Sequence, residues 1–284
     1  MDNVLNENKI NIPLKGFTHG GKFHSDDVFA TAFLKIINPD IVIERGFEVP
    51  EEFAGIVYDI GRGKFDHHQA DKEYRQNGCP YAAFGLIWRE YGSLIFDEEE
   101  VKRFDLSFVQ PLDESDNTGS DNTLADIIDE FNPNWDSDES YDDCFFRAVD
   151  FAKQILENHF KAVKGVMRAK ALVDKAMEDC DGSILILPEF APWKNVVVGS
   201  TYKFVVYPSI RGGYSVQGVP ISLEDRTLVC PFPEEWCGRQ PEELVEMTGI
   251  KTLRFCHPNA FLAAAEERED AVKTAQLVLD KYVG

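Results

Sequence analysis

The stretch LKGFTHGGKFHSDDVFATAFLKII, residues 14–37, predicts a strand, a tight turn and a helix in direct succession. Leu14–Thr18 has the apolar character of a buried strand. Ser25–Ile37 predicts a helix, because Ser25 is a candidate N-cap and the two aspartates after it suit the positive end of the helix dipole. Asn38 and Pro39 end this helix.

The same rhythm continues outward from this stretch. Ile41–Glu44 and Gly55–Ile60 predict further strands, and Tyr81–Tyr91 predicts a helix that ends at Gly92. Strands that alternate with helices indicate an α/β domain with a mostly parallel sheet, which we place at residues 1–140. In such sheets, functional sites gather at the carboxyl ends of the strands.

The rest of the chain follows two other patterns. Apolar residues recur every three or four positions from about Tyr141 to Cys180, which predicts one or two long helices in a helical connector, residues 141–182. Residues 183–284 predict a smaller α+β domain that closes with an amphipathic helix, Phe261–Val283. The strands expected in this domain are Ser183–Leu187, Asn195–Val198, Lys203–Tyr207, Tyr214–Val219 and Thr252–Cys256, with Arg211-Gly212-Gly213 at a hairpin tip.

The composition excludes several classes of protein. Of the 284 residues, 44% are hydrophobic and 12% aromatic, so the chain is not a disordered one. Its apolar runs fall far short of the roughly 18 residues that a membrane span needs, and its first residues lack the features of a signal peptide. The six cysteines form no Cys-x-x-Cys pair, so we expect reduced thiols in a cytoplasmic protein without a membrane partner.

The charge is strongly negative and unevenly distributed. A net charge of −21 argues against a protein that holds long nucleic acid on a broad basic face. Residues 97–143 carry 17 Asp and Glu against two Lys and Arg, and we interpret this acidic stretch as the solvated faces of helices. The rest of the chain is nearer to neutral, which leaves room for a short or metal-bridged phosphate substrate.

Histidine and aspartate side chains gather near predicted strand ends and turns. Imidazole and carboxylate together suit first-row divalent ions such as Mn²⁺, Co²⁺ or Zn²⁺. Two ions about 3.5–4 Å apart need a shared carboxylate, and Asp59, at a strand end between two clusters, is the natural bridge. Each residue alone has an ordinary structural explanation, but their joint occurrence predicts a metal site. The group comprises His19, His24, Asp26, Asp59, Asp66-His67-His68, and a polar loop with Asp113 and Asp116.

Two of these segments carry a family resemblance. Thr18–Asp27 is similar to the pattern Thr-His-x-Gly-x-Phe-His-Cys-Asp-Glu, with Ser in place of Cys and Asp in place of Glu. Phe65–Gln69 contains the triplet Asp-His-His. The sequence therefore resembles the melanocyte proliferating gene family, a branch of the DHH-type phosphoesterases, over nearly its whole length. Asp113–Asn117 is similar to the fourth metal motif of that family, in which either aspartate is a candidate ligand.

The resemblance implies an assignment for the metal site. It implies two divalent ions, expected to be Mn²⁺, with Co²⁺, Zn²⁺ or Mg²⁺ as alternatives. Behind the ligands, Asp66 would orient His67 or His68, and Asp113 would support the fourth motif. The catalytic residues implied are Asp59, shared by both ions, and His68, which would face the substrate. The ligands implied are His19, His24 and Asp59 for one ion, and Asp26, Asp59, His67 and Asp116 for the other.

The resemblance also implies a substrate. It points to hydrolysis of phosphodiester bonds, as a 3′-to-5′ exoribonuclease that acts on RNA or short oligonucleotides. In the last domain, Lys194, Arg211 and His257 are candidates to meet substrate phosphate. Gly212, Gly213 and Asn259 are further candidates, although a tight turn explains the glycines and an N-cap of the closing helix explains the asparagine.

Two other functions remain open from the residues. A His/Asp metal centre also activates water for amide or other acyl hydrolysis. A non-catalytic module that senses a nucleotide or a metal would carry the same ligands and show no turnover. Parallel assays with a phosphodiester and a panel of peptides separate these hypotheses. The native metal and the oligomeric state are left open.

Overall fold

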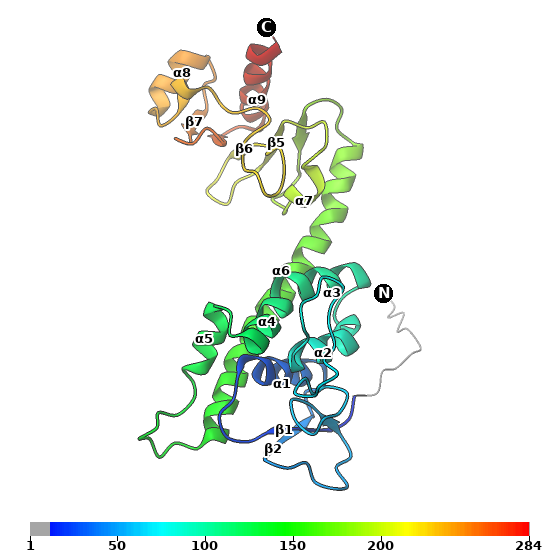
Figure 1. Ribbon diagram of the computed structural model, residues 1–284. Coiled ribbons are helices and arrows are strands. Elements are labelled where there is room, and N and C mark those ends of the chain that lie inside the picture. The colour runs from blue at the N-terminus through cyan, green and yellow to red at the C-terminus, as the bar shows by residue number, and fades with distance from the viewer. Residues whose placement is uncertain (1–11, 284) are drawn as a thin grey trace. The chain divides into compact units, whose positions relative to one another are not determined.

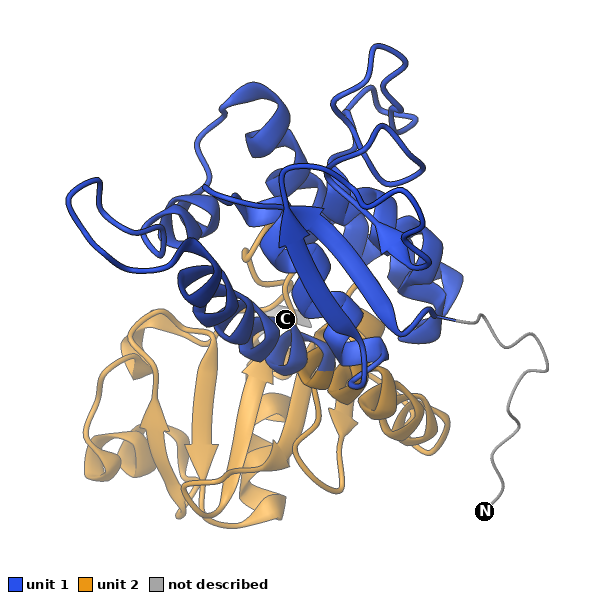
Figure 2. Ribbon diagram, turned by 90° about the horizontal axis from the view of Figure 1, so that it is seen from below, with its two compact units in different colours: residues 1–160 blue, residues 161–284 orange. Residues whose placement is uncertain are grey.

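The computed structural model describes residues 12–283, and Figure 1 labels their helices and strands. Two compact units follow one another along the chain, Met1–Phe160 (unit 1) and Lys161–Gly284 (unit 2), which Figure 2 colours separately. The three-part division predicted from the sequence remains a prediction. Within the described part of the chain, no helix combines the length and the apolar character needed to cross a membrane.

Unit 1 contains a three-stranded sheet in which every pairing is parallel, as the alternation of strands and helices predicted. Its strand order is β2-β1-β3. The central strand, β1, is Lys15–His19, and its middle residues are buried. Its neighbours are β2, Val42–Gly46, and the very short β3, Ile56–Val57. Since the three strands run in one direction, their carboxyl ends meet at one edge of the sheet.

The first helix of unit 1, α1, has the predicted bounds Ser25–Ile37, but Ser25 is not its N-cap. His24 occupies the cap position, and its backbone N–H donates to the Asp27 carboxylate over 3.0 Å. The third residue of the helix therefore turns back to satisfy the first turn, which is a form of capping box. As a result, Asp27 is fixed close to His24.

The remaining helices of unit 1 begin with α2, Ala83–Tyr91, and the acidic stretch is largely helical. The predicted polar loop around Asp113 and Asp116 is wrong, because both residues lie in a helix. Proline in its first turn starts that helix, and Gly119 ends it in the left-handed conformation, with φ 70°. The helix that contains Asp113 and Asp116 is α4. The helical segments that follow α2 are η1 (Gly92–Leu94), α3 (Glu98–Phe104), η2 (Asp105–Val109), α4 (Gln110–Thr118) and α5 (Thr123–Asp129).

Buried aromatic rings hold these helices together. Trp88 of α2 is completely buried, and its ring centroid lies 4.6 Å from that of Phe104 and 5.0 Å from that of Phe33. Phe160 packs against the same tryptophan. Phe160 belongs to α6, a continuous helix of 38 residues, Tyr141–Glu178, where one or two helices were expected. This packing fixes α1 and α2, which carry residues of the candidate site.

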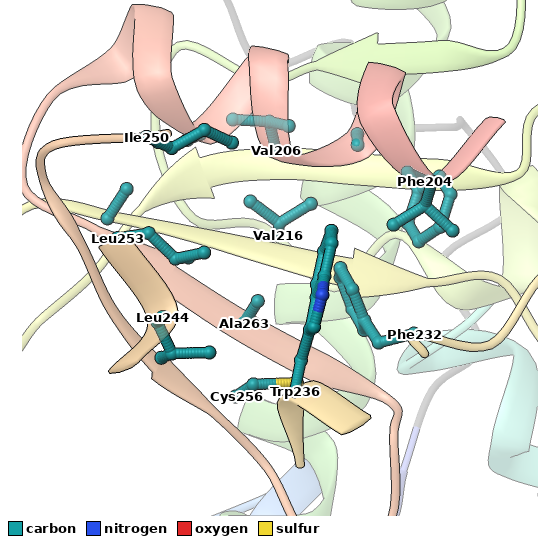
Figure 3. Close-up of a cluster of buried hydrophobic side chains, with 14 of the residues drawn as sticks. Phe204, Val206, Val216, Phe232, Trp236, Leu244, Ile250, Leu253, Cys256 and Ala263 are labelled. Atoms are coloured by element: carbon teal, nitrogen blue, oxygen red, sulfur yellow. The ribbon is translucent and has the colours of Figure 1, made fainter. Parts of the chain in front are cut away.

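Unit 2 is built on a five-stranded sheet of order β4-β5-β6-β8-β7. Its β4–β5 pair is parallel and the other pairs are antiparallel. One face packs against α9, and Figure 3 shows the buried cluster there, with Val206, Val216, Ala263 and Trp236. The elements are β4 (Ile184–Ile186), α7 (Lys194–Val197), β5 (Phe204–Pro208), β6 (Tyr214–Gly218), η3 (Glu234–Trp236), α8 (Pro241–Thr248), β7 (Leu253–Cys256), β8 (Leu262–Ala265) and α9 (Arg268–Val283).

Two predictions for unit 2 are wrong. The expected strand Asn195–Val198 is instead the single helical turn α7. The expected helix Phe261–Val283 begins with strand β8, which inserts between β6 and β7, and only α9 is helical. Asn259 consequently lies in the β7–β8 connection and caps no helix. The turn predicted at Arg211-Gly212-Gly213 is present between β5 and β6.

Candidate metal centre

Asp59 lies at the centre of the cluster, just beyond β3. Its backbone has φ 56°, a left-handed conformation that costs a non-glycine residue about 1–3 kcal/mol. Its Oδ2 lies 3.1 Å from Nε2 of His19, which ends β1. Its Oδ1 lies 3.1 Å from Nε2 of His67. The Nδ1 of His68 also lies 3.5 Å from Oδ1 of Asp59, so one carboxylate oxygen faces His19 and the other faces His67 and His68.

His67 faces three carboxylates. Its Nε2 lies 3.1 Å from Oδ1 of Asp59, 3.3 Å from Oδ2 of Asp116 and 3.6 Å from Oδ2 of Asp26. Ligand atoms that share an ion at about 2.0–2.2 Å lie roughly 3.0–3.5 Å apart, so this spacing is close to that of one coordination shell. The four residues are those predicted for the second ion. Asn117 lies on the other side of the ring, with its Oδ1 3.3 Å from His67 Nδ1.

A second group forms around His19. Its Nε2 lies 3.2 Å from Oδ2 of Asp27 and 3.1 Å from Oδ2 of Asp59. Asp27 was not among the predicted site residues, and its position beside Asp26 in the same motif was the available signal. His24 was predicted to share an ion with His19, but its potential ligand atom groups with Asp26 and Asp116 instead.

Burial destabilises the charged forms of two adjacent aspartates, Asp26 and Asp27, unless a cation lies nearby. Asp26 and Asp27 are completely buried. Among the described residues, none forms a hydrogen bond with Oδ1 of Asp26, whereas its Oδ2 accepts from the Ala83 N–H over 3.2 Å. Burial, followed by the nearby charges of Asp59 and Asp116, raises the pKa of Asp26 well above its ordinary value. A buried carboxylate oxygen without a partner is what a divalent ion would satisfy.

The imidazoles and the central carboxylate favour each other's charged forms. Burial alone would raise the pKa of Asp59, but hydrogen bonds from His19 and His67 outweigh it and lower that pKa to about 2. Burial would lower the pKa of His19, yet Asp27 and Asp59 raise it to about 10. Asp59 thus stays ionised at neutral pH, as a ligand shared by two cations must.

His68 differs from His67 in its exposure. Its side chain is 62% exposed, and its Nδ1 lies 2.9 Å from Oδ1 of Asp66. Asp66 also accepts the backbone N–H groups of His68 and Arg62. Burial would raise the pKa of Asp66, but these hydrogen bonds lower it. Of the two histidines that Asp66 was predicted to orient, it contacts His68.

Asp113 and Asp116, the two candidate metal ligands of α4, differ in the groups that they contact. Asp116 faces His67, as described above. Asp113 is completely buried and instead pairs with Arg75, whose Nη2 donates to its Oδ2 over 2.7 Å. The other oxygen of Asp113 accepts the Gly85 N–H over 3.0 Å. Asp113 therefore braces α4 against α2 and is not grouped with the cluster.

The cluster opens into a pocket of about 470 Å³, which is lined by two lysines that were not predicted from the sequence. Lys22 lines it and pairs with Asp129 over 3.0 Å. Lys72 lines it and donates to Oδ1 of Asn117 over 3.1 Å. Small-ligand sites commonly have volumes of about 300–1,000 Å³, so this pocket has the size of such a site, and Asp116, Asp126 and Asp129 line it together with the two lysines.

The six residues predicted to meet substrate all lie in unit 2, and four of them divide between two pockets. Arg211 and His257 line one groove. Lys194 and Asn259 line another pocket, together with Arg226, for which no role was predicted. Gly212 and Gly213 lie in the turn after Arg211, with φ 83° and 65°. The structure thus brings the predicted substrate residues together in pairs.

Comparison with known proteins identifies close relatives along the whole chain. A MYG1 protein of Dictyostelium discoideum is 28% identical over 93% of this chain and 96% of its own length. A MYG1 protein of Chlamydia pneumoniae is 30% identical over 94% of this chain and 97% of its own. The Homo sapiens protein named MYG1 exonuclease is 27% identical over 95% and 87%. No solved structure matches the chain.

A family model also matches. It covers residues 16–279, bears the MYG1 exonuclease label and is described as an uncharacterised protein family (UPF0160). The match includes both units, so it extends from the histidine and aspartate cluster to the last helix. It confirms the family resemblance carried by the motifs around His19 and His67. The chain belongs to the MYG1 family.

Proposed function

We propose that this protein is a metal-dependent phosphodiesterase that removes nucleotides from the 3′ end of RNA or short oligonucleotides. The observation that carries the proposal is the buried convergence of Asp26, Asp59, His67 and Asp116, with one carboxylate oxygen left unpartnered. The exonuclease names of mammalian relatives support a reaction that proceeds from a chain end. The DHH-type assignment of the catalytic domain belongs to the same proposal.

The donor set supports two ions, with Mn²⁺ as the preferred one. Imidazole nitrogens and carboxylate oxygens are the ligands that such ions take, and no cysteine is grouped with them among the described residues. We assign Asp59 to both ions, His67, Asp26 and Asp116 to one, and His19 with Asp27 to the other. His24 then joins Asp26 and Asp116. When bound, the ions would supply an activated water and neutralise charge on the phosphoryl group.

His68 is the residue that we assign to proton transfer. Asp66 holds its Nδ1, which leaves Nε2 as the nitrogen for substrate. The side chain is exposed, so a bound substrate could reach it and take a proton on the leaving oxygen. General acid catalysis of this kind raises the reaction rate about 10²–10⁴-fold. Asp66 acts as its positioning residue, because it accepts hydrogen bonds from both the ring Nδ1 and the backbone N–H of His68.

Each unit has its own cations that are candidates to bind phosphate. Lys22 and Lys72 line the pocket beside the cluster and are our candidates for the phosphate next to the cleaved bond. The roles of Lys194, Arg211, Gly212, Gly213, His257 and Asn259 in binding further phosphates remain part of the proposal.

The test is hydrolysis of a short 5′-labelled RNA with added Mn²⁺, followed on a denaturing gel. We expect the wild-type protein to produce a ladder that shortens from the 3′ end. Asp59→Ala should produce none, while Asp138→Ala, which removes an exposed aspartate of unit 1, should match the wild type. Equal rates for wild type and Asp59→Ala, or hydrolysis of a peptide panel in place of RNA, would contradict the proposal.

A further inference from the structure

One face of the sheet of unit 2 is covered along its whole width, and the other only in part. On the second face, Val173 of α6 and Val197 of α7 pack against Val205 of β5 in a buried cluster. Among the described residues, that cluster includes none from β6, β8 or β7. Three neighbouring strands therefore present side chains that no helix of this cluster buries.

The register of the strands aligns two aromatic rings in one row across this face, from Tyr207 at the edge of the buried cluster to Phe255 on β7. Tyr207 lies opposite Ser215, Ser215 opposite Ala264, and Ala264 opposite Phe255. Side chains directly opposite on antiparallel strands point to the same face, so these four form one row. Two small side chains in the middle separate a tyrosine at one end from a phenylalanine at the other. The row is a shallow floor with an aromatic ring at each end.

The row is buried at Tyr207 and Ser215 and exposed at its Phe255 end. Phe255 is 39% exposed, and Phe190, from the loop before α7, is 56% exposed. The Phe190 ring centroid lies 5.3 Å from that of Tyr207, which extends the aromatic surface. These residues line a groove of about 670 Å³, which we call the aromatic groove.

The charge at the rim of the aromatic groove is positive. Arg211, Arg254 and His257 line it, and its lining includes no Asp or Glu, although the chain as a whole has a net charge of −21. Arg254 is the additional residue of a β-bulge, since the register shifts between Leu253 and Phe255. Its guanidinium donates to the Gly212 carbonyl, which ties it to the turn that carries Arg211.

We propose that the aromatic groove binds single-stranded nucleic acid by stacking a base on Phe255 and Phe190, with Arg211 and Arg254 on the adjoining phosphates. Aromatic rings beside arginines form the usual platform for unpaired bases, and stacking tolerates any base. A duplex hides its base faces, so it cannot use the groove. The identity of the ligand as nucleic acid rests on the proposed function.

The test is equilibrium binding of a labelled single-stranded RNA to the full-length protein in EDTA, measured by fluorescence anisotropy. Phe255→Leu keeps an apolar side chain but removes the ring, and we expect it to weaken binding about tenfold. Phe255→Tyr should retain wild-type affinity, and Phe190→Leu should weaken binding as Phe255→Leu does. Trp135→Ala, which removes a 96% exposed ring from unit 1, is the matched control and should bind normally.

Several results would overturn the inference. These are wild-type protein that does not bind the single strand, equal affinity for single strand and duplex, or Phe255→Leu and Phe190→Leu variants with wild-type affinity. The proposed function fails separately. Wild-type protein that binds single strands but leaves them intact with Mn²⁺ removes the catalysis and retains the groove. Hydrolysis without any effect of the ring variants on affinity removes the groove and retains the catalysis.

Discussion

The two units use charge and aromatic rings in opposite ways. Around its candidate site, unit 1 packs α1 and α2 with buried rings such as Trp88, and it also buries the carboxylates of Asp26 and Asp27 at the start of α1. Unit 2 leaves Phe190 and Phe255 exposed and surrounds them with cations. Buried carboxylates without enough partners are stabilised by a bound cation or by protonation, whereas exposed rings can stack on a flat ligand. The comparison separates a site suited to chemistry from one suited to holding a strand.

The largest effect should come from Asp26→Asn, which tests the buried charge. The amide keeps the shape and removes one charge beside Asp59 and Asp116, so Mn²⁺ should bind poorly and hydrolysis should fall by about a hundred- to thousandfold or more. The metal-free variant should unfold at a higher urea concentration than metal-free wild type, because a buried repulsion is relieved. Wild-type hydrolysis by this variant would show that the cluster is structural.

His68→Gln sharpens the distinction between a ligand and a catalytic residue. Hydrolysis should fall by roughly a hundredfold or more, because the proton donor is lost. Mn²⁺ affinity, measured by calorimetry, should stay within about threefold of the wild type, because His19, His67 and the carboxylates are intact and Asp66 holds His68 closer than Asp59 does, at 2.9 Å against 3.5 Å. A parallel loss of affinity and rate would instead make His68 a metal ligand.

Arg75→Met tests how unit 1 supports its site. Arg75 is buried and pairs with Asp105 and Asp113 over 2.7 Å, so its removal leaves a buried carboxylate unpaired. Such a loss typically costs about 3–5 kcal/mol in the free energy of unfolding. Urea unfolding measures it, with Arg211→Met, an exposed arginine of unit 2, as the control. Equal stability of both variants would show that the Arg75 pairs contribute little.

The smallest predicted effect concerns the turn of unit 2. At Gly213 the backbone has φ 65°, and a Cβ there would lie 2.4 Å from the Ala265 carbonyl oxygen. At Gly212 φ is 83° and a Cβ would meet open space. Gly213→Ala should therefore destabilise the protein by about 1–3 kcal/mol, and Gly212→Ala by less. The reverse order, measured by thermal unfolding, would contradict the role assigned to this close approach.

Much of unit 1 could be predicted because local signals agreed with the tertiary structure. The helix over Ser25–Ile37 has an acidic first turn and a Pro stop, and its bounds were correct. Around Asp113, polarity suggested a loop, yet the Arg75 pairs and the left-handed Gly119 define the end of a helix. Composition alone does not reveal a partner 38 positions away in the chain.

In unit 2, pairing between distant strands overrode local propensity. Leu262–Ala265 has the sequence Leu-Ala-Ala-Ala, which favours a helix, but it forms β8 because β6 and β7 pair with it on both sides. Val196 and Val197 have β-branched side chains and still lie in the helical turn α7.

The residue types in the sequence identified the candidate site residues. They did not show which of these side chains lie together in the structure. The family resemblance implied that His19 and His24 share an ion, and in the structure Asp27, through its capping contact with His24, places its other oxygen beside His19. Arg211 and His257 of the aromatic groove were nominated from the sequence, but its rings and Arg254 were not, because their positions depend on strand register and on the bulge at Arg254.

The most direct test of the two-ion site is a calorimetric titration of metal-free protein with Mn²⁺, in wild type and in Asp59→Ala. We predict two ions per chain for the wild type, and at most one, bound more weakly, for the variant that lacks the shared carboxylate. Wild-type protein that takes up no Mn²⁺, or a variant that binds two ions with wild-type affinity, would contradict the metal centre.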